Sequence, residues 1–409
     1  MTGKKNFVIV GAGLAGASAA KELRDQGFEG TIQLIGKEPH APYIRPPLSK
    51  GYLQGSEGLD AVYVHPQDWY DEHNIDVHTG ATVVGVDTAE HTVALSGGET
   101  LRYDKLLLTT GADSRQPTID GAGLSGVHTL RTLDDSNAVR DKLADGGRSV
   151  VLIGAGWIGM EVAATAKSLG NKVTILDRNA VPLAGAIGDE LGTFFAEKHR
   201  SHGVTVRSSV IVDRIIGANG QLSGVVLDSG EEIPADLVMV GIGAVPNTSL
   251  AHAAGLAVDN GILVDSALNT SAPNVFAAGD VANELHPVIG MRLRTEHWAN
   301  ALNQGAAAAR SMLGQAESFD DIPYFYTDQF DIGMEFSGYG PLMKDARIAY
   351  RGERDSGEFV AFWLKDSVVV AGMNVNVWDV NDQVQRLIRE KTVVDEARLT
   401  DSAVALADV

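Results

Sequence analysis

The sequence predicts an α/β protein with two parallel-sheet domains and a smaller α+β domain toward its C-terminal end. Three observations predict this fold. The chain has 409 residues, which is enough for two or three domains. Its 46 glycines follow no collagen-like period and so indicate many tight turns. A long segment of the first half is also matched about 140 residues later, and a repeat of this size indicates a duplicated domain.

Each copy begins with an apolar run that leads into a glycine turn, at Phe7–Val10 and again at Val150–Ile153. Continuous apolar runs predict strands buried on both faces, as in a parallel sheet, and the alternating segments inside each copy predict a small antiparallel meander. The later parts of the copies also match, with extended runs at 74–78 and 203–207 and closing strands at 106–111 and 237–241.

A third region begins near Pro323 and lacks the glycine turn. Its runs Glu358–Leu364 and Val368–Ala371 predict antiparallel strands joined by a short turn, and Asp379 is expected to cap a helix that continues to Glu390. The predicted domains are a discontinuous first domain of residues 1–113 and 239–321, a second domain of residues 114–238, and a C-terminal domain of residues 322–409.

The charge and the residue types exclude several functions. Acidic residues outnumber basic residues 53 to 33, and a net charge of −20 opposes binding to nucleic acid or to an anionic membrane. The chain has no cysteine, which excludes disulfides, thiolate nucleophiles, and cysteine-ligated metal or iron–sulfur sites. No histidines group at metal-ligand spacing, so we expect no metal. The absence of a signal-like or long apolar segment predicts a cytoplasmic protein.

The two glycine turns both follow the pattern G-x-G-x-x-G between a strand and a helix. In this pattern the first glycine makes the turn, the second lets the backbone approach a pyrophosphate, and the third packs the helix on the strand. The helix N-terminus then faces the anion with free N–H groups. One such match also occurs as a purely structural turn. The glycines concerned are Gly11, Gly13 and Gly16 in the first copy and Gly154, Gly156 and Gly159 in the second.

Each fingerprint is completed by an acid after the next strand, Glu38 in the first copy and Asp177 in the second. An acid about 20 residues further on is what a ribose 2′-hydroxyl requires, so two Rossmann-like domains and two dinucleotides are predicted. Asp177 would repel the 2′-phosphate of NADPH and therefore favours NADH. Arg178 follows directly and leaves two alternatives, a partner for that phosphate or a solvated surface arginine.

Three further segments resemble a specific family, namely Pro42–Lys50, Leu107–Ala112 and Asn274–Asp280. They are similar to those of the FAD-dependent NADH:ferredoxin reductases of bacterial oxygenase systems, which serve aromatic-ring dioxygenases and camphor-type haem monooxygenases. The resemblance covers nearly the whole chain. It implies a glutathione-reductase-like fold in which the first and third segments hold FAD, the middle segment holds NADH, and the C-terminal domain covers the flavin.

Together with the fingerprints, the resemblance assigns binding residues to both cofactors. Those expected to bind FAD are Gly11, Gly13, Ala15, Gly16, Glu38, Arg45, Pro46, Lys50, Val83, Thr110, Gly111, Arg131, Gly279, Asp280, Val281, His297 and Trp298. Those expected to bind NADH are Gly154, Gly156, Trp157, Ile158, Gly159, Asp177, Arg178, Gly241, Ile242 and Gly243.

Three residues are expected to act on the flavin. Lys50 resembles the family's lysine beside flavin N5, Glu161 resembles its acidic partner, and Trp298 resembles the ring beside the isoalloxazine. Glu161 lies in the otherwise apolar first part of a helix, where an unpaired carboxylate would be costly to bury, so an ion pair with Lys50 is predicted. The alternatives are a surface glutamate for Glu161, a core aromatic for Trp298 and a helix cap for Asp280.

The implied function is transfer of electrons from NADH through FAD to a small [2Fe-2S] ferredoxin, in aromatic hydrocarbon catabolism. Alternatives are a rubredoxin reductase, or a redox-responsive NADH-binding flavoprotein of the apoptosis-inducing-factor type. The sequence leaves the oligomeric state open between monomer and dimer. The ferredoxins of the resembled family are themselves generally acidic, and two acidic proteins repel each other. Docking of the ferredoxin on this protein is therefore expected to need a local basic patch. Its candidates are Arg292, Arg294, Lys344, Arg347, Arg351, Arg354, Arg386 and Arg389.

Overall fold

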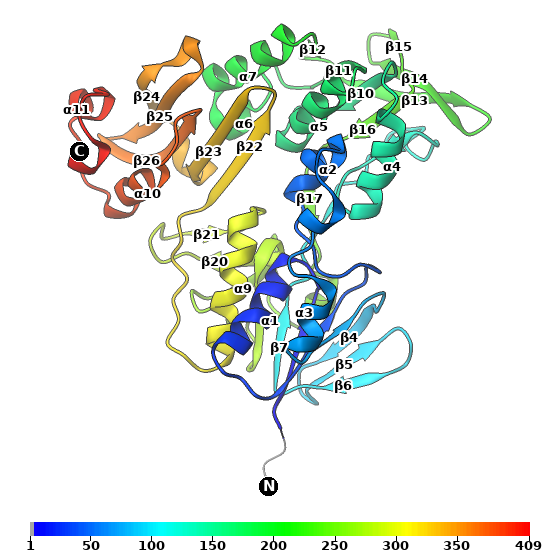
Figure 1. Cartoon of the computed structure of the whole chain (residues 1–409), viewed down its shortest axis with the longest axis vertical. Coiled ribbons are helices and arrows are strands. Elements are labelled where there is room, and N and C mark those ends of the chain that lie inside the picture. Colours follow the sequence, from blue (N-terminus) through cyan, green and yellow to red (C-terminus); the bar gives the residue numbers. More distant parts are fainter. Residues whose placement is uncertain (1–3) are drawn as a thin grey trace. The chain divides into compact units, whose positions relative to one another are not determined.

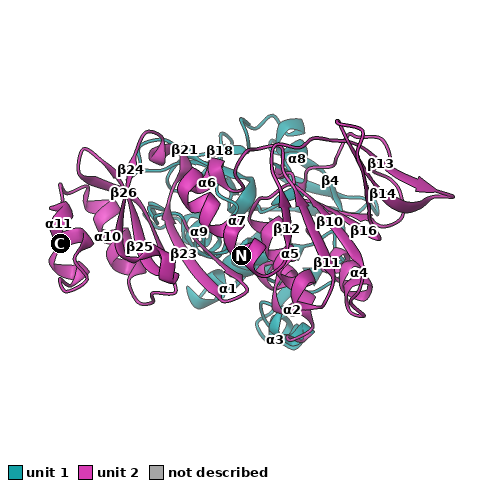
Figure 2. Ribbon diagram, turned by 90° about the horizontal axis from the view of Figure 1, so that it is seen from above, with its two compact units in different colours: residues 1–44, 59–113, 245–323 teal, residues 45–58, 114–244, 324–409 magenta. Residues whose placement is uncertain are grey.

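The computed structural model describes residues 4–409, which form two compact units (Figure 2). In the described part of the chain, unit 1 comprises residues 4–44, 59–113 and 245–323, and unit 2 comprises residues 45–58, 114–244 and 324–409. Two short strands, β8 (Ala112–Ser114) and β17 (Ala244–Pro246), lie where the chain passes from one unit to the other.

Unit 1 contains a five-stranded parallel sheet in the order β19-β7-β1-β2-β3. After their first residues, the central strands β1 and β7 are apolar and buried, as expected for strands covered on both faces, and they contribute to the core of this unit. The strands are β1 (Asn6–Val10), β2 (Thr31–Ile35), β3 (Ile75–His78), β7 (Lys105–Leu108) and β19 (Val275–Ala277).

Helices α1 (Leu14–Asp25) and α9 (Trp298–Met312) pack against each other within unit 1 (Figure 1). Gly305 permits this close approach, because a Cβ added to it would lie 2.3 Å from the carbonyl oxygen of Ala15. The remaining elements are α3 (Gln67–Glu72), α8 (Ser249–Ala253), the meander β4 (Val83–Asp87), β5 (Thr92–Leu95) and β6 (Thr100–Arg102), and the small sheet β18 (Ile262–Val264), β20 (Ala282–Leu285) and β21 (Arg292–Leu293).

Unit 2 contains a second parallel sheet, in the order β12-β11-β10-β16-β9. Strands β10 and β11 pair over five residues, from Ser149↔Lys172 to Ile153↔Leu176, as β1 and β2 do from Asn6↔Thr31 to Val10↔Ile35. The equal register confirms that the repeated sequence is a repeated fold. The strands are β9 (Val127–His128), β10 (Ser149–Ile153), β11 (Lys172–Leu176), β12 (Thr205–Arg207) and β16 (Leu237–Val240).

Helices α5 and α7 pack against this sheet. The antiparallel strands β13, β14 and β15 form the second meander that the repeat predicted. Thr132 and Asp135 form a capping box at the start of α4, each bonding the other's backbone N–H. The elements are α2 (Gly51–Gln54), α4 (Leu133–Leu143), α5 (Trp157–Ser168), α6 (Ala184–Ile187), α7 (Asp189–Ser201), β13 (Val212–Ala218), β14 (Gln221–Leu227) and β15 (Glu232–Pro234).

The C-terminal part of unit 2 is an antiparallel sheet in the order β22-β23-β26-β25-β24, followed by two helices. Its apolar residues share one core with those of α5 and α7. The elements are β22 (Tyr324–Gln329), β23 (Ile332–Gly338), β24 (Arg347–Glu353), β25 (Glu358–Lys365), β26 (Val368–Val375), α10 (Asn381–Glu390) and α11 (Glu396–Thr400).

Two local expectations in this region have different outcomes. The hairpin between β25 and β26 is confirmed, and both residues of its turn, Asp366 and Ser367, have positive φ, as a two-residue turn of type I′ requires. The expected cap at Asp379 is wrong. The N-cap of α10 is Val380, without a side-chain bond, because Asp379 has a left-handed backbone with φ 61° and lies one residue too early.

Candidate functional site

The first glycine turn separates the roles of its three glycines. A Cβ added to Gly11 (φ 119°) would lie 2.1 Å from the carbonyl oxygen of Thr109, and one added to Gly16 would lie 2.1 Å from that of Gly11. Both glycines are therefore required by the chain itself. A Cβ on Gly13 would meet nothing within 4 Å, so the space beside the middle glycine is free of protein atoms.

The second turn repeats this arrangement. A Cβ on Gly154 (φ 100°) would lie 2.3 Å from the carbonyl oxygen of Gly241, and one on Gly159 would lie 2.5 Å from that of Gly154, whereas Gly156 again meets nothing within 4 Å. Helices α1 and α5 begin directly after the middle glycines without a side-chain cap, so their first N–H groups remain for an anion. Both turns fit a bound pyrophosphate.

Apolar side chains also lie exposed beside the second turn. Ile158 and Ile242 are 49% and 39% exposed, although both flank glycines of a buried strand-turn-helix unit. Gly243, next along the chain, has open space where its Cβ would be. Exposed aliphatic side chains around an open glycine turn are suited to cover by the rings of a nucleotide. These residues, with the half-buried Trp157, fit the expected NADH site within unit 2.

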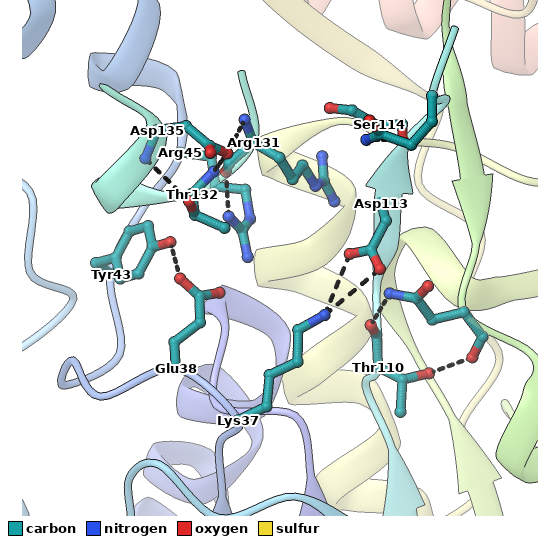
Figure 3. Close-up of polar contacts among 12 residues, drawn as sticks. Lys37, Glu38, Tyr43, Arg45, Thr110, Asp113, Ser114, Arg131, Thr132 and Asp135 are labelled. Carbon is teal, nitrogen blue, oxygen red and sulfur yellow. Dashed lines mark hydrogen bonds and ion pairs between the residues drawn. The ribbon is translucent and has the colours of Figure 1, made fainter. Parts of the chain in front are cut away.

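The two acids are held differently. Asp177 is 6% exposed, and its oxygens accept backbone N–H bonds from Ala155 in the glycine turn (3.0 Å) and from Asn179 (2.8 Å). Glu38 instead accepts a hydrogen bond from the hydroxyl of Tyr43 (Figure 3). Arg178 is exposed and makes no ion pair or hydrogen bond within residues 4–409.

Most residues expected to bind FAD belong to unit 1. Gly279 (φ 76°) begins a short 3-10 turn, and its N–H donates to Oε1 of Gln304 on α9 at 2.9 Å. Trp298 is the first residue of α9, after the N-cap His297, and its buried indole Nε1 has no partner within the described part of the chain. An orphaned donor at an uncapped helix start fits a ligand with acceptor atoms, such as the flavin edge.

The other expected FAD residues of unit 1 are held by backbone bonds or packed in its core. Thr110 donates to the carbonyl oxygen of Asn247 at 2.8 Å (Figure 3), and Gly111 accepts from the N–H of the same residue. Val83 packs in the core of the unit. Ala15 and Val281 are also buried, whereas Asp280 is partly exposed.

Arg45, Pro46, Lys50 and Arg131, which are also expected to bind FAD, belong to unit 2. Arg45 donates to the carbonyl oxygen of Arg131, and the N–H of Arg131 donates to Asp135 at 3.0 Å (Figure 3). Pro46 opens the short 3-10 turn that ends at Ser49, directly before Lys50.

Lys50 and Glu161 form the ion pair that the buried carboxylate predicted. Nζ of Lys50 lies 2.6 Å from Oε1 of Glu161, and the two side chains are 15% and 6% exposed. Two hydroxyls that sequence reasoning missed complete the cluster, since Ser49 donates to Oε2 at 2.5 Å and Thr327 donates to Oε1 at 2.6 Å. Lys50 also lies 5.5 Å from the centre of the Tyr326 ring.

Glu284 is a second buried acid that the sequence did not reveal. Burial raises its pKa to about 8, an effect that a hydrogen bond with Gln304 opposes and Asp321 reinforces. Its Oε2 has no partner among the described residues. Because Gln304 also accepts from Gly279, Glu284 is linked through one side chain to the turn before Asp280.

The expected basic patch is largely neutralised within the chain. The arginines that form ion pairs with neighbouring carboxylates are Arg294, Arg347, Arg354 and Arg386. Arg292 and Arg351 donate to main-chain carbonyl oxygens. These charges therefore balance local acids and dipoles, and Lys344 remains exposed.

Within residues 4–409, no three or more acidic or histidine side chains are grouped so as to hold a metal ion. Among the described helices, none combines the length and apolar character needed to span a membrane.

Comparisons with known proteins identify the family. Residues 5–305 match the family model described as pyridine nucleotide-disulphide oxidoreductase, and residues 324–409 match the one described as reductase C-terminal. A ferredoxin–NAD(P)+ reductase from a Sphingomonas species is 37% identical and is covered over 95% of its length by 97% of this chain. Rhodocoxin reductase from Rhodococcus erythropolis is also 37% identical, with 92% of it and 98% of this chain covered.

Among solved structures, the covalent complex of putidaredoxin reductase with putidaredoxin contains a chain that matches with a TM-score of 0.94 and 34% identity. The match covers 98% of this chain and 97% of that one. It agrees with two parallel-sheet nucleotide-binding folds followed by an antiparallel C-terminal domain. The chain therefore belongs to the pyridine nucleotide-disulphide oxidoreductases and, within them, to the ferredoxin–NAD(P)+ reductase family of oxygenase systems, flavoproteins that use FAD and NAD(P)H.

Proposed function

We propose that this protein passes electrons from NADH through FAD to a small [2Fe-2S] ferredoxin, which in turn feeds an oxygenase. The observation that carries the proposal is the pair of glycine turns, each with an open middle glycine ahead of an uncapped helix. Two such turns provide for two dinucleotides. The family description includes disulphide reduction, but this chain has no cysteine that could take part in that reaction. The electrons are therefore proposed to pass from FAD to an acceptor other than a disulphide of this chain.

The proposed division of labour follows the predicted domains. Residues 1–113 and 239–321 hold FAD, residues 114–238 hold NADH, and residues 322–409 cover the flavin. Bound FAD supplies the ability to accept two electrons as a hydride and to release them singly. The chain supplies position and electrostatics through its glycine turns, its helix N-termini and the acids Glu38 and Asp177.

Lys50 and Trp298 are proposed to contact the flavin, and Glu161 is proposed to hold the ammonium of Lys50. An ammonium fixed by a carboxylate keeps a single position, so it can stabilise charge that develops on a neighbouring ring without reorganisation. The N-terminus of α9 adds a partial positive charge at Trp298. Both features would favour uptake of electrons by the flavin.

The coenzyme is proposed to be NADH in preference to NADPH. The carboxylate of Asp177 is fixed at the glycine turn by two backbone bonds, so it cannot turn away from a ribose that binds there. A 2′-phosphate would meet this negative charge directly. Arg178 is exposed and has no other partner within residues 4–409, so it is the group that would reduce the preference.

The test is reduction of candidate acceptors by NADH under anaerobic conditions, with a panel of purified ferredoxins and a rubredoxin. The protein as purified, or after reconstitution with FAD, is expected to show oxidised-flavin absorbance that NADH bleaches. At least one ferredoxin should then be reduced at a rate that depends on the enzyme. Flavin that NADH does not bleach, or faster reduction of the rubredoxin than of every ferredoxin, would overturn the proposal.

A further inference from the structure

A chain of buried hydrogen bonds leads from helix α7 to the carboxylate of Glu161. His199 Nε2 lies 2.9 Å from Gln329 Oε1, and Gln329 Nε2 lies 3.2 Å from Thr327 Oγ1. Thr327 Oγ1 in turn lies 2.6 Å from Glu161 Oε1. The four residues come from α7, β22 and α5 in unit 2 (Figure 1), and all four are buried.

The bonds of this chain all point toward Glu161. The carboxylate of Glu161 only accepts, so the hydroxyl of Thr327 donates to it and accepts from the amide of Gln329. The amide oxygen of Gln329 then faces His199, whose Nε2 must carry the hydrogen. Burial lowers the pKa of His199 to about 4, so its ring is neutral near pH 7. Hydrogen bonds aligned in this way polarise one another.

The pattern of β22 explains how the strand brings these groups together. Alternate residues of a strand share a face, so Phe325, Thr327 and Gln329 lie on one side. Phe325 packs on Trp157 at the start of α5, with ring centres 5.2 Å apart. The apolar contact therefore sets the strand against the helix, and Thr327 follows at the depth of Glu161.

Stability alone does not account for this polar chain. A buried polar network replaced by apolar side chains of the same shape often loses little stability or gains some. Here the chain ends on the one carboxylate oxygen that also receives the ammonium of Lys50. A shift of that oxygen would move the ammonium with it.

We propose that Thr327 is a positioning residue that fixes the carboxylate of Glu161, and through it the ammonium of Lys50, while Gln329 and His199 hold its hydroxyl as the donor. This inference rests on the proposed function, because Lys50 acts on the flavin only there. It gives the C-terminal sheet a part in electron transfer, since one of its strands sets the position of a charge beside the cofactor.

The experiment compares Thr327→Val, which keeps the shape but removes the hydroxyl, with Thr327→Ser, which restores it. Ser337→Ala is the matched control, because Ser337 is fully buried in the same sheet and loses a comparable bond to Asn381 (2.6 Å). The measurements on the FAD-loaded proteins are the flavin midpoint potential, the rate of flavin reduction at saturating NADH, and the apparent Kd for NADH.

We expect Thr327→Val to slow flavin reduction about tenfold, as loss of one hydrogen bond to a charged group implies, with the Kd for NADH changed less than about twofold. Its midpoint potential should move in the negative direction, because a displaced ammonium stabilises the reduced flavin less. Thr327→Ser should return the rate of flavin reduction to within about threefold of wild type. It should also return the flavin midpoint potential close to the wild-type value. Gln329→Leu should add little in the Thr327→Val background.

The inference is overturned if Thr327→Val behaves like Ser337→Ala, with lower stability but an unchanged potential and reduction rate. A wild-type protein that takes up no flavin would instead refute the proposed function. In that case the positioning role of Thr327 is tested by a double-mutant cycle between Thr327→Val and Lys50→Met, measured in the unfolding free energy of the full chain. Coupling between the two substitutions would support the positioning role, and strict additivity would overturn it.

Discussion

Replacing Glu284 with glutamine is expected to stabilise the protein, by an amount that grows with pH. Glu284 is 1% exposed, its Oε2 has no partner among the described residues, and burial raises its pKa to about 8. Glutamine has nearly the same shape and carries no charge. It can also keep a hydrogen bond with the side-chain amide of Gln304.

The sign and size of this stability change follow from the protonation of Glu284 in the folded and unfolded chain. The unfolded chain releases this proton above about pH 4.5, its ordinary value, whereas the folded chain retains it to about pH 8. Unfolding is therefore increasingly favoured as pH rises through this window. Between these two pKa values, each unit of pH lowers the free energy of unfolding of the wild type by about 1.4 kcal/mol. The variant Glu284→Gln should therefore be more stable than wild type by near zero at pH 4.5, about 3 kcal/mol at pH 7 and about 5 kcal/mol above pH 8.

The assay is urea unfolding of wild type and Glu284→Gln between pH 4.5 and pH 8.5, followed by fluorescence and circular dichroism. Glu99→Gln, an exposed glutamate between β5 and β6, is the matched control and should show no such pH-dependent gain. A difference between Glu284→Gln and wild type that does not change with pH, or that favours wild type at pH 8, would refute the reasoning.

Three further predictions concern other charged groups. Lys50→Met and Glu161→Gln should each destabilise the protein by about 3–5 kcal/mol, because each leaves a buried partner unpaired, and the double variant should lose clearly less than the sum; additive losses in urea unfolding would contradict the coupling. Asp177→Ala should narrow the ratio of kcat/KM for NADH over NADPH, and removal of Arg178 should widen it; a wild-type ratio at or below one would refute the preference. Burial lowers the pKa of His199 to about 4, below its ordinary value of 6.5. The free energy of unfolding should therefore be unaffected by His199 above pH 6.5 and should fall by about 3 kcal/mol as the pH drops from 6.5 to 4. An equal fall in His199→Gln would contradict this origin.

The sequence predicted those parts of the fold and site that depend on local patterns. Both glycine turns could be recognised because Gly11 and Gly154 must adopt positive φ, a requirement that leaves a trace in the sequence. The ion pair of Lys50 and Glu161 could be predicted because a carboxylate in an apolar helix needs a partner. In each case a short segment contained the physical reason.

The parts that could not be predicted depend on contacts between distant segments. Thr327 reaches Glu161 across 166 positions, and a threonine in a strand carries no sign of the side chain it will face. Glu284 lies in a short strand whose burial comes from packing in unit 1. Arg347 and Arg354 of the expected patch looked available because their ion-pair partners, Glu396 and Glu190, are far away in the sequence.

The electron count of the reaction tests the central claim most directly. NADH gives up two electrons together and a ferredoxin accepts one, so the protein must divide the pair. In an anaerobic titration with limiting NADH, the account predicts two molecules of ferredoxin reduced for each NADH consumed, at a rate proportional to enzyme and only when FAD is bound. NADH consumption without ferredoxin reduction, or ferredoxin reduction by the FAD-free chain, would contradict it.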